Sequence, residues 1–210
     1  TLVENLRASG AVIIAKTVMT EMAHWMTMGI PQNYSALGGY AFNPYDPRRD
    51  PRPGLNDGRG VLATGSSSSG AGTATSLWAA NIGTETTVSI IGPASAAMLA
   101  AVKPTLGRIS RWGVIPVTYD QDTAGPMTRT VEDTALIMNV IAGPDPRDPS
   151  SSGRDAEDYT AELGEGVSGT RIGIPKEHFF DVIDDEVREA VMRAAGVLKG
   201  LGASVQEVSV

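Results

Sequence analysis

The stretch TVEDTALIMNVIAGP (residues 130–144) has the clearest secondary-structure signal in the chain. The helices and strands on both sides of it are predicted starting from this stretch. Thr130 is followed three residues later by Asp133, a spacing that resembles the capping box at the start of a helix. Gly143 and Pro144 close the stretch, because glycine commonly ends helices and proline cannot continue them. The stretch therefore predicts a helix over residues 131–142.

Helices and strands alternate on both sides of this helix. At the start of the chain Leu2, Val3 and Leu6 form the inward face of a short amphipathic helix that Gly10 ends. The other expected elements are helices over residues 72–82 and 184–200 and strands over residues 11–17, 171–175 and 204–210. This alternation favours an α/β fold with a mixed, mostly parallel sheet and helices on both faces.

The composition and net charge indicate which classes of binding partner this protein is not expected to have. The 210 residues are 41 % hydrophobic and 20 % charged, as is typical of a globular protein with a substantial core. The net charge of −7 argues against nucleic acid or an anionic membrane surface as the main partner. No apolar run reaches the roughly 18 residues that a membrane-spanning helix needs. We therefore expect neither nucleic acid nor membrane as a partner.

The chain has no cysteine, which removes disulfides, thiol nucleophiles and cysteine-based metal sites. We expect no metal and no organic cofactor. Because no secretory signal is visible either, a cytoplasmic location is expected. The first ten residues resemble the middle of a helix, so we also expect the chain to be part of a larger protein.

Four consecutive serines lie between two glycines in GSSSSGAGTATS (residues 65–76). One interpretation is a flexible Gly/Ser linker. A linker should be followed by polar residues, yet this run leads directly into Leu77 and Trp78. The pattern favours a packed turn that carries a catalytic serine.

A serine nucleophile needs a base that takes its proton. The two histidines, His24 in an expected helix and His178, have no G-x-S-x-G elbow as a partner. Lys16 follows the apolar run Val12–Ala15, and a lysine at the end of a buried strand can lose its proton through desolvation. The alternative is that Lys16 simply reaches solvent.

Several long segments, in order and over essentially all 210 residues, resemble the amidase signature family of serine hydrolases. They include GAVIIAKTVMTEMA (10–23), GSSSSGAG (65–72), GTETTVSIIGPAS (83–95) and the string from VKPTLGRISR to AGPDPRD (102–148). The resemblance implies one partial amidase signature domain over residues 1–210. Its parts would be a serine loop at 65–72, a nucleophile segment at 83–95, a core string at 102–148 and a strand–helix–strand unit at 170–210.

The resemblance also implies a mechanism. Members of this family cleave a carbon–nitrogen amide bond through an acyl-enzyme, using a Ser–cis-Ser–Lys triad. Ser89 matches the nucleophile and Lys16 the base. Ser68 is the first choice for the bridging serine and Ser67 the second.

The chain departs from the family pattern just before the nucleophile. Thr87 and Val88 stand where the family has glycines, although the backbone N–H groups of Thr86, Thr87 and Val88 could still bind an oxyanion. A β-branched valine is poorly suited to the positive φ that glycine allows. A weakened or inactive relative that acts as a binding protein is therefore one alternative.

A second alternative is one component of an amidotransferase, which releases ammonia from glutamine. For the hydrolase, the expected partner is a small-molecule amide, and a homodimer is left open. Within the 102–148 string we expect three arginines to hold loops through hydrogen bonds, with a contact from one of them to a polar substrate left open. We expect one acidic segment to make a turn near the site rather than to bind metal. These residues are Arg108, Arg111, Arg129 and the turn Asp120–Asp122.

Overall fold

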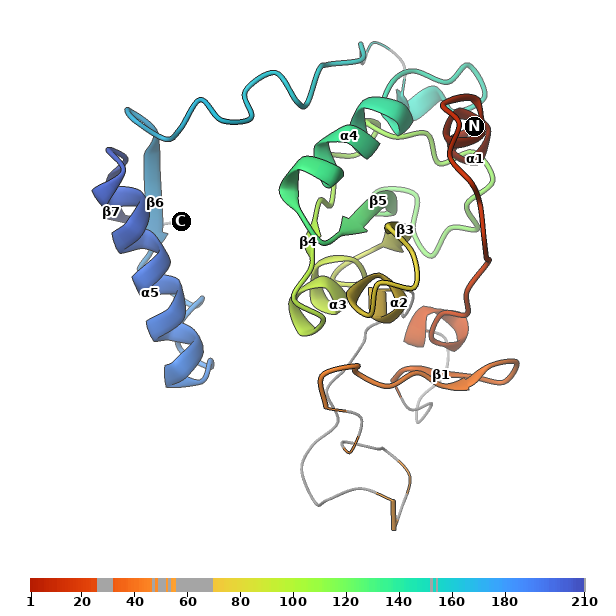
Figure 1. Ribbon diagram of the computed structural model, residues 1–210, viewed down its shortest axis with the longest axis horizontal. Coiled ribbons are helices and arrows are strands. Elements are labelled where there is room, and N and C mark those ends of the chain that lie inside the picture. The colour runs from red at the N-terminus through yellow and green to blue at the C-terminus, as the bar shows by residue number, and fades with distance from the viewer. Residues whose placement is uncertain are drawn as a thin grey trace. The chain divides into compact units, whose positions relative to one another are not determined.

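The computed structural model of the chain describes residues 1–25, 32–46, 48, 52, 54–55, 70–151, 153 and 155–209 (Figure 1). They form two compact units, Thr1–Ala161 and Glu162–Val210. In the first unit the helices are α1 (Leu2–Ala8), α2 (Gly70–Ala74), α3 (Ile91–Ala96) and α4 (Val131–Ile141), with 3₁₀ turns η1 (Glu21–His24) and η2 (Pro149–Ser151). Its strands are β1 (Tyr34–Ser35), β2 (Gly39–Tyr40), β3 (Ala80–Glu85), β4 (Ala100–Ala101) and β5 (Thr123–Thr128).

A three-stranded antiparallel sheet in the order β3–β5–β4 forms the centre of the first unit. All six residues of β5 are buried. Because side chains alternate along a strand, Ala124 contributes to one core cluster and Met127 to another on the opposite face. Figure 1 shows α4 on one side of this sheet and α2 and α3 on the other. The expected α/β class with helices on both faces of a sheet is thus confirmed.

The helix predicted from Thr130 is present. The Thr130 side chain accepts a hydrogen bond from the backbone N–H of Asp133 at 3.0 Å, which caps α4. The helix ends at Ile141, and Gly143 follows with a φ of +126° that favours glycine. On its inner face α4 buries Met138 and Ile141.

Several expectations for the first unit were wrong. Residues 11–17 form no strand: the segment has no regular structure, and the Val12 side chain is 83 % exposed. An apolar run becomes a strand only where another backbone pairs with it, and no described strand does so here. The helix expected over 72–82 ends at Ala74, and Ala80 already begins β3. In α1, Leu2 and Leu6 pack against the core, but Val3 is about half exposed.

The second unit is a strand–helix–strand motif of β6 (Arg171–Pro175), α5 (Asp185–Gly200) and β7 (Ser204–Val208). The two strands pair in parallel, with Arg171 opposite Ser204, as a helical crossover allows. All three elements confirm the sequence prediction. This is the one parallel pairing among the described strands, so the mostly parallel sheet that we expected is not observed.

Candidate active site

The loop that holds Ser89 runs from the end of β3 to the start of α3. The Glu85 side chain at the end of β3 is only 1 % exposed and turns back across this loop. Its Oε2 accepts hydrogen bonds from the backbone N–H groups of Ile90 at 2.6 Å and Ile91 at 2.9 Å. Glu85 therefore closes the turn in which Ser89 lies, a role that we did not predict.

Ser89 lines a pocket of about 480 Å³, a volume within the range of small-molecule sites. The segment around η1 also lines this pocket and contributes the 64 % exposed side chain of Trp25. No Asp, Glu, Lys or Arg occurs among the described residues that line the pocket. Those residues are Thr20, Ala23, His24, Trp25, Gln32, Thr87, Val88, Ser89, Gly92, Pro93, Ser95 and Ala96.

The backbone of the Ser89 loop presents several hydrogen-bond donors. Among the described residues, no acceptor takes the N–H groups of residues 86–89. None of residues 86–89 has a positive φ. The expectation that Val88 occupies a position demanding the φ of glycine was therefore wrong, and the valine fits its backbone without strain.

Lys16 does not occupy the position that we expected. It is exposed, it lies outside any strand, and it is not among the residues that line the pocket of Ser89. Ser67 and Ser68, with the rest of the serine run 66–69, lie outside the described residues. Of the predicted site residues, Thr87, Val88 and Ser89 line the pocket and Thr86 does not, while the triad as a whole stays a prediction.

A left-handed turn contributes Ala23 and His24 to the lining of the same pocket. Met22, Ala23 and His24 have φ values of 50°, 54° and 59°, so the helix expected around His24 is instead a short 3₁₀-like turn. Left-handed backbone costs about 1–2 kcal/mol for each residue other than glycine. Such strain is concentrated at functional sites, where the surrounding structure maintains it.

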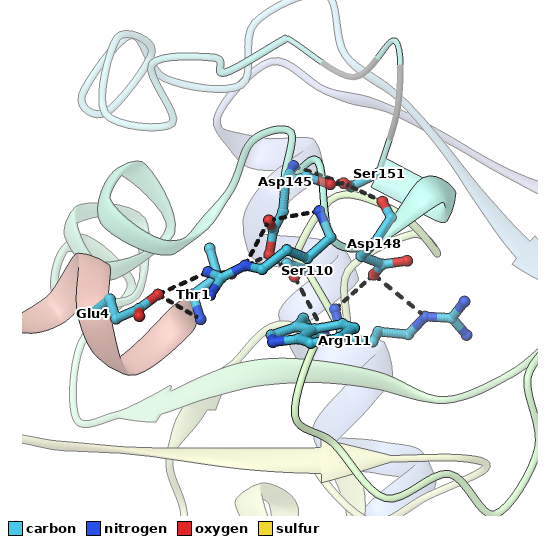
Figure 2. Close-up of polar contacts among 9 residues, drawn as sticks. Thr1, Glu4, Ser110, Arg111, Asp145, Asp148 and Ser151 are labelled. Atoms are coloured by element: carbon cyan, nitrogen blue, oxygen red, sulfur yellow. Dashed lines mark hydrogen bonds and ion pairs between the residues drawn. The ribbon is translucent and has the colours of Figure 1, made fainter.

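A second pocket, of about 460 Å³, lies beside the loop after Ser110. Figure 2 shows two buried aspartates that organise this region. Asp145 accepts a hydrogen bond from the Ser110 hydroxyl at 2.6 Å, which, with further hydrogen bonds, holds the pKa of Asp145 well below its usual range. Asp148 accepts from the backbone N–H of Arg111 at 2.7 Å and from the Ser150 hydroxyl at 2.6 Å. These carboxylates fix loops.

The three arginines of the 102–148 string that we expected to hold loops do so. Arg108 forms an ion pair with Glu157 at 2.8 Å, and Arg111 donates to the backbone oxygen of Tyr119. Arg129 donates to the backbone oxygens of Thr73 and Trp78, both at 2.9 Å.

The predicted acidic turn is also present: Asp122 Oδ2 accepts from the backbone N–H groups of Val117 at 2.6 Å and Thr118 at 3.1 Å. Within the described ranges no group of three or more His, Asp or Glu side chains is placed to hold a metal ion. None of the described helices has the length and apolarity that crossing a bilayer would require.

The chain is similar to known amide-processing proteins along its whole length. It is 41 % identical over 210 residues to a glutamyl-tRNA(Gln) amidotransferase subunit from Marinobacter nauticus and covers 41 % of that protein. Among solved structures, peptide amidase from Stenotrophomonas maltophilia is 37 % identical with a TM-score of 0.86, and the match covers 99 % of this chain and 41 % of the other.

The glutamyl-tRNA(Gln) amidotransferase subunit of the same kind from Thermotoga maritima is 30 % identical with a TM-score of 0.84, over 99 % of this chain and 42 % of that one. The chain thus spans well under half the length of the relatives that it matches. The family model described as amidase matches residues 1–210. The chain therefore belongs to the amidase family, the amidase signature enzymes.

Proposed function

We propose that the protein of which this chain is part hydrolyses a carbon–nitrogen amide bond, with Ser89 as the nucleophile. One observation carries the proposal: Ser89 lines a pocket of about 480 Å³ on a loop whose backbone N–H groups, over residues 86–89, have no acceptor among the described residues. A nucleophile and available donors on one loop are what acyl transfer requires.

In the proposed reaction the Ser89 hydroxyl oxygen attacks the amide carbonyl carbon. The hydroxyl proton passes through Ser68 to Lys16, and the oxyanion accepts hydrogen bonds from the N–H groups of Thr86, Thr87 or Val88. Collapse of the intermediate returns the proton to the leaving amine and forms the acyl-enzyme. Water then attacks the ester and releases the acid.

We further propose that both compact units belong to one amidase domain, because the range matched by the family model includes both Thr1–Ala161 and Glu162–Val210. The proposed substrate is a small amide. The part of the pocket described here favours an uncharged group, since neither carboxylates nor ammonium or guanidinium groups line it.

The second candidate is one component of an amidotransferase, which releases ammonia from glutamine. It is favoured by the 41 % identity to a protein named for that activity. Activity that depends strictly on glutamine or asparagine and on a partner protein would select this candidate. Turnover of simple amides by the isolated protein would select the hydrolase.

A fluorophosphonate probe tests the nucleophile directly. We expect a single adduct that maps to Ser89, is lost in Ser89→Ala and is strongly slowed in Lys16→Ala. Ser95→Ala is the matched control, because Ser95 lines the same pocket from α3 and its loss should leave the adduct at Ser89. A protein that takes no label and cleaves no amide would instead support the inactive, ligand-binding relative.

A further inference from the structure

We infer that Asp122 is a positioning residue for the reaction at Ser89: it holds Thr86, and through Thr86 the loop that carries the nucleophile. The inference rests on the proposed function, because it assigns a role in that same site. Asp122 lies directly before β5 and its side chain is only 5 % exposed.

Both carboxylate oxygens of Asp122 are engaged, and they face two different loops. Oδ1 accepts a hydrogen bond from the Thr86 hydroxyl at 2.6 Å. Oδ2 accepts from the backbone N–H groups of Val117 and Thr118. One side chain therefore joins the turn at residues 117–118 to Thr86, which lies 36 positions before Asp122 in the sequence.

Thr86 is the place where such a tether has most effect on Ser89. Before it, Glu85 is paired with Thr123 in the sheet, and the Glu85 carboxylate binds the far end of the loop at Ile90. Between these fixed ends the backbone N–H groups of residues 86–89 have no described acceptor. The Thr86–Asp122 hydrogen bond is thus the one side-chain tether that the described residues provide between Glu85 and Ser89.

The functional consequence follows from the sensitivity of nucleophilic attack to geometry. A displacement of about 1 Å in a reacting group can cost about 10²-fold in rate. A loop that has lost its tether would place both the Ser89 oxygen and its N–H donors less accurately. We expect the loss to appear in kcat, with KM little changed, since ground-state binding does not depend on the tether.

Two variants break the tether from opposite ends. Thr86→Val removes the hydroxyl donor and leaves the bonds from Asp122 to residues 117–118 intact. Asp122→Ala removes all the acceptors. Asp148→Ala is the matched control, because Asp148 is also buried and also accepts from a backbone N–H and a hydroxyl, but among the described residues it has no hydrogen bond or ion pair with the Ser89 loop.

The experiment measures kcat, KM and the midpoint of thermal unfolding for the whole enzyme on one amide, for the three single variants and for Thr86→Val combined with Asp122→Ala. We expect kcat to fall about 10- to 100-fold in both tether variants, and the double variant to be no slower than the slower single variant. Asp148→Ala should lower the unfolding midpoint and keep kcat within about twofold.

Full kcat in Thr86→Val, or losses that multiply in the double variant, would overturn the inference while leaving the hydrolase intact. An equal fall of kcat in Asp148→Ala would also overturn it, since a general loss of stability would then explain the result. A parent enzyme that neither cleaves amides nor takes the fluorophosphonate at Ser89 would overturn the proposed function itself, and the inference with it.

Discussion

Glu85 is expected to contribute more to stability than any other side chain of the Ser89 loop. The decisive change is Glu85→Ala, which deletes the acceptor that two backbone N–H groups share. Ile90 is 0 % exposed, so water cannot replace the lost carboxylate at its N–H. Ile91 is partly exposed, and water can satisfy its N–H more readily.

The size of the destabilisation follows from the backbone N–H groups of Ile90 and Ile91, which lose their acceptor. A buried donor left without a partner costs about 1–3 kcal/mol, which applies in full to Ile90 and in part to Ile91. The truncated side chain also leaves a gap that the loop fills incompletely. We therefore expect Glu85→Ala to lower the free energy of unfolding by about 3 kcal/mol. Glu85→Gln retains one acceptor oxygen and should cost about 1 kcal/mol.

Urea denaturation followed by circular dichroism measures these differences. Glu132→Ala is the control, because Glu132 is an exposed glutamate in the first turn of α4 and its loss should change stability by about 0.5 kcal/mol or less. A Glu85→Ala protein within about 0.5 kcal/mol of the parent would refute the reasoning. It would mean that the loop reaches the same structure without the two hydrogen bonds.

Three further outcomes follow from single residues. The hydrogen bond from Ser110 lowers the folded-state pKa of Asp145. Ionised Asp145 therefore stabilises the folded protein at pH values above its ordinary pKa of 3.8, and this stabilisation is lost as the pH falls below that value. In Asp145→Asn we expect the free energy of unfolding to fall less steeply with acid, which a series of urea denaturations at different pH values would measure. Gly125→Ala would bring a Cβ atom to 2.2 Å from the backbone oxygen of Val102, so we expect the thermal midpoint to fall by well over 5 °C, and an unchanged midpoint would contradict the packing. Trp25→Ala should raise KM for aromatic amides about tenfold and leave KM for acetamide within twofold, and equal effects on both would exclude a direct contact.

The parts of the fold that the sequence predicted are those with local signals. The cap at Thr130 and the glycine after the helix are local features, and both α4 and the β6–α5–β7 unit were predicted in place. The central strand β5 was not, because TAGPMT has no β-branched run and includes a proline. Burial on both faces, which involves residues far along the chain, makes this segment a strand.

The apolar run before Lys16 shows the opposite error. Val12, Ile13 and Ile14 have the composition of a buried strand, yet their side chains are exposed in the described structure. Hydrophobicity indicates that a segment tends to be covered, but it does not identify the segment that covers it. For this reason the sequence could not establish the surroundings of Lys16.

For the candidate site, the sequence predicted only the residues that belong to a recognisable motif. The resemblance pointed to Ser89 and its neighbours, of which Thr87, Val88 and Ser89 line a pocket, while their catalytic roles stay a prediction. Glu85 and Asp122 were not recognised as supports of the loop. Their roles consist of hydrogen bonds between segments that only the fold brings together, such as the bond from Thr86 to Asp122. A sequence motif identifies residue types at given spacings. A hydrogen bond between distant segments forms only if the tertiary fold places both segments side by side.

The substitution at Val88 acts through its side chain, because the backbone does not require glycine there. With φ negative throughout residues 86–89, a glycine would add conformational freedom to the unfolded chain and relieve no strain. In the folded loop, Glu85 binds the backbone N–H of Ile90 at the far end, and Asp122 accepts a hydrogen bond from Thr86 near its start. These bonds hold the loop in a conformation that does not need glycine. What the valine changes is the pocket: its side chain, 56 % exposed, is branched and stiff and lies next to Ser89. If Ser89 is the nucleophile, as proposed, the departure from the family pattern bears on which amides fit, because no residue of 86–89 has a positive φ that would demand glycine.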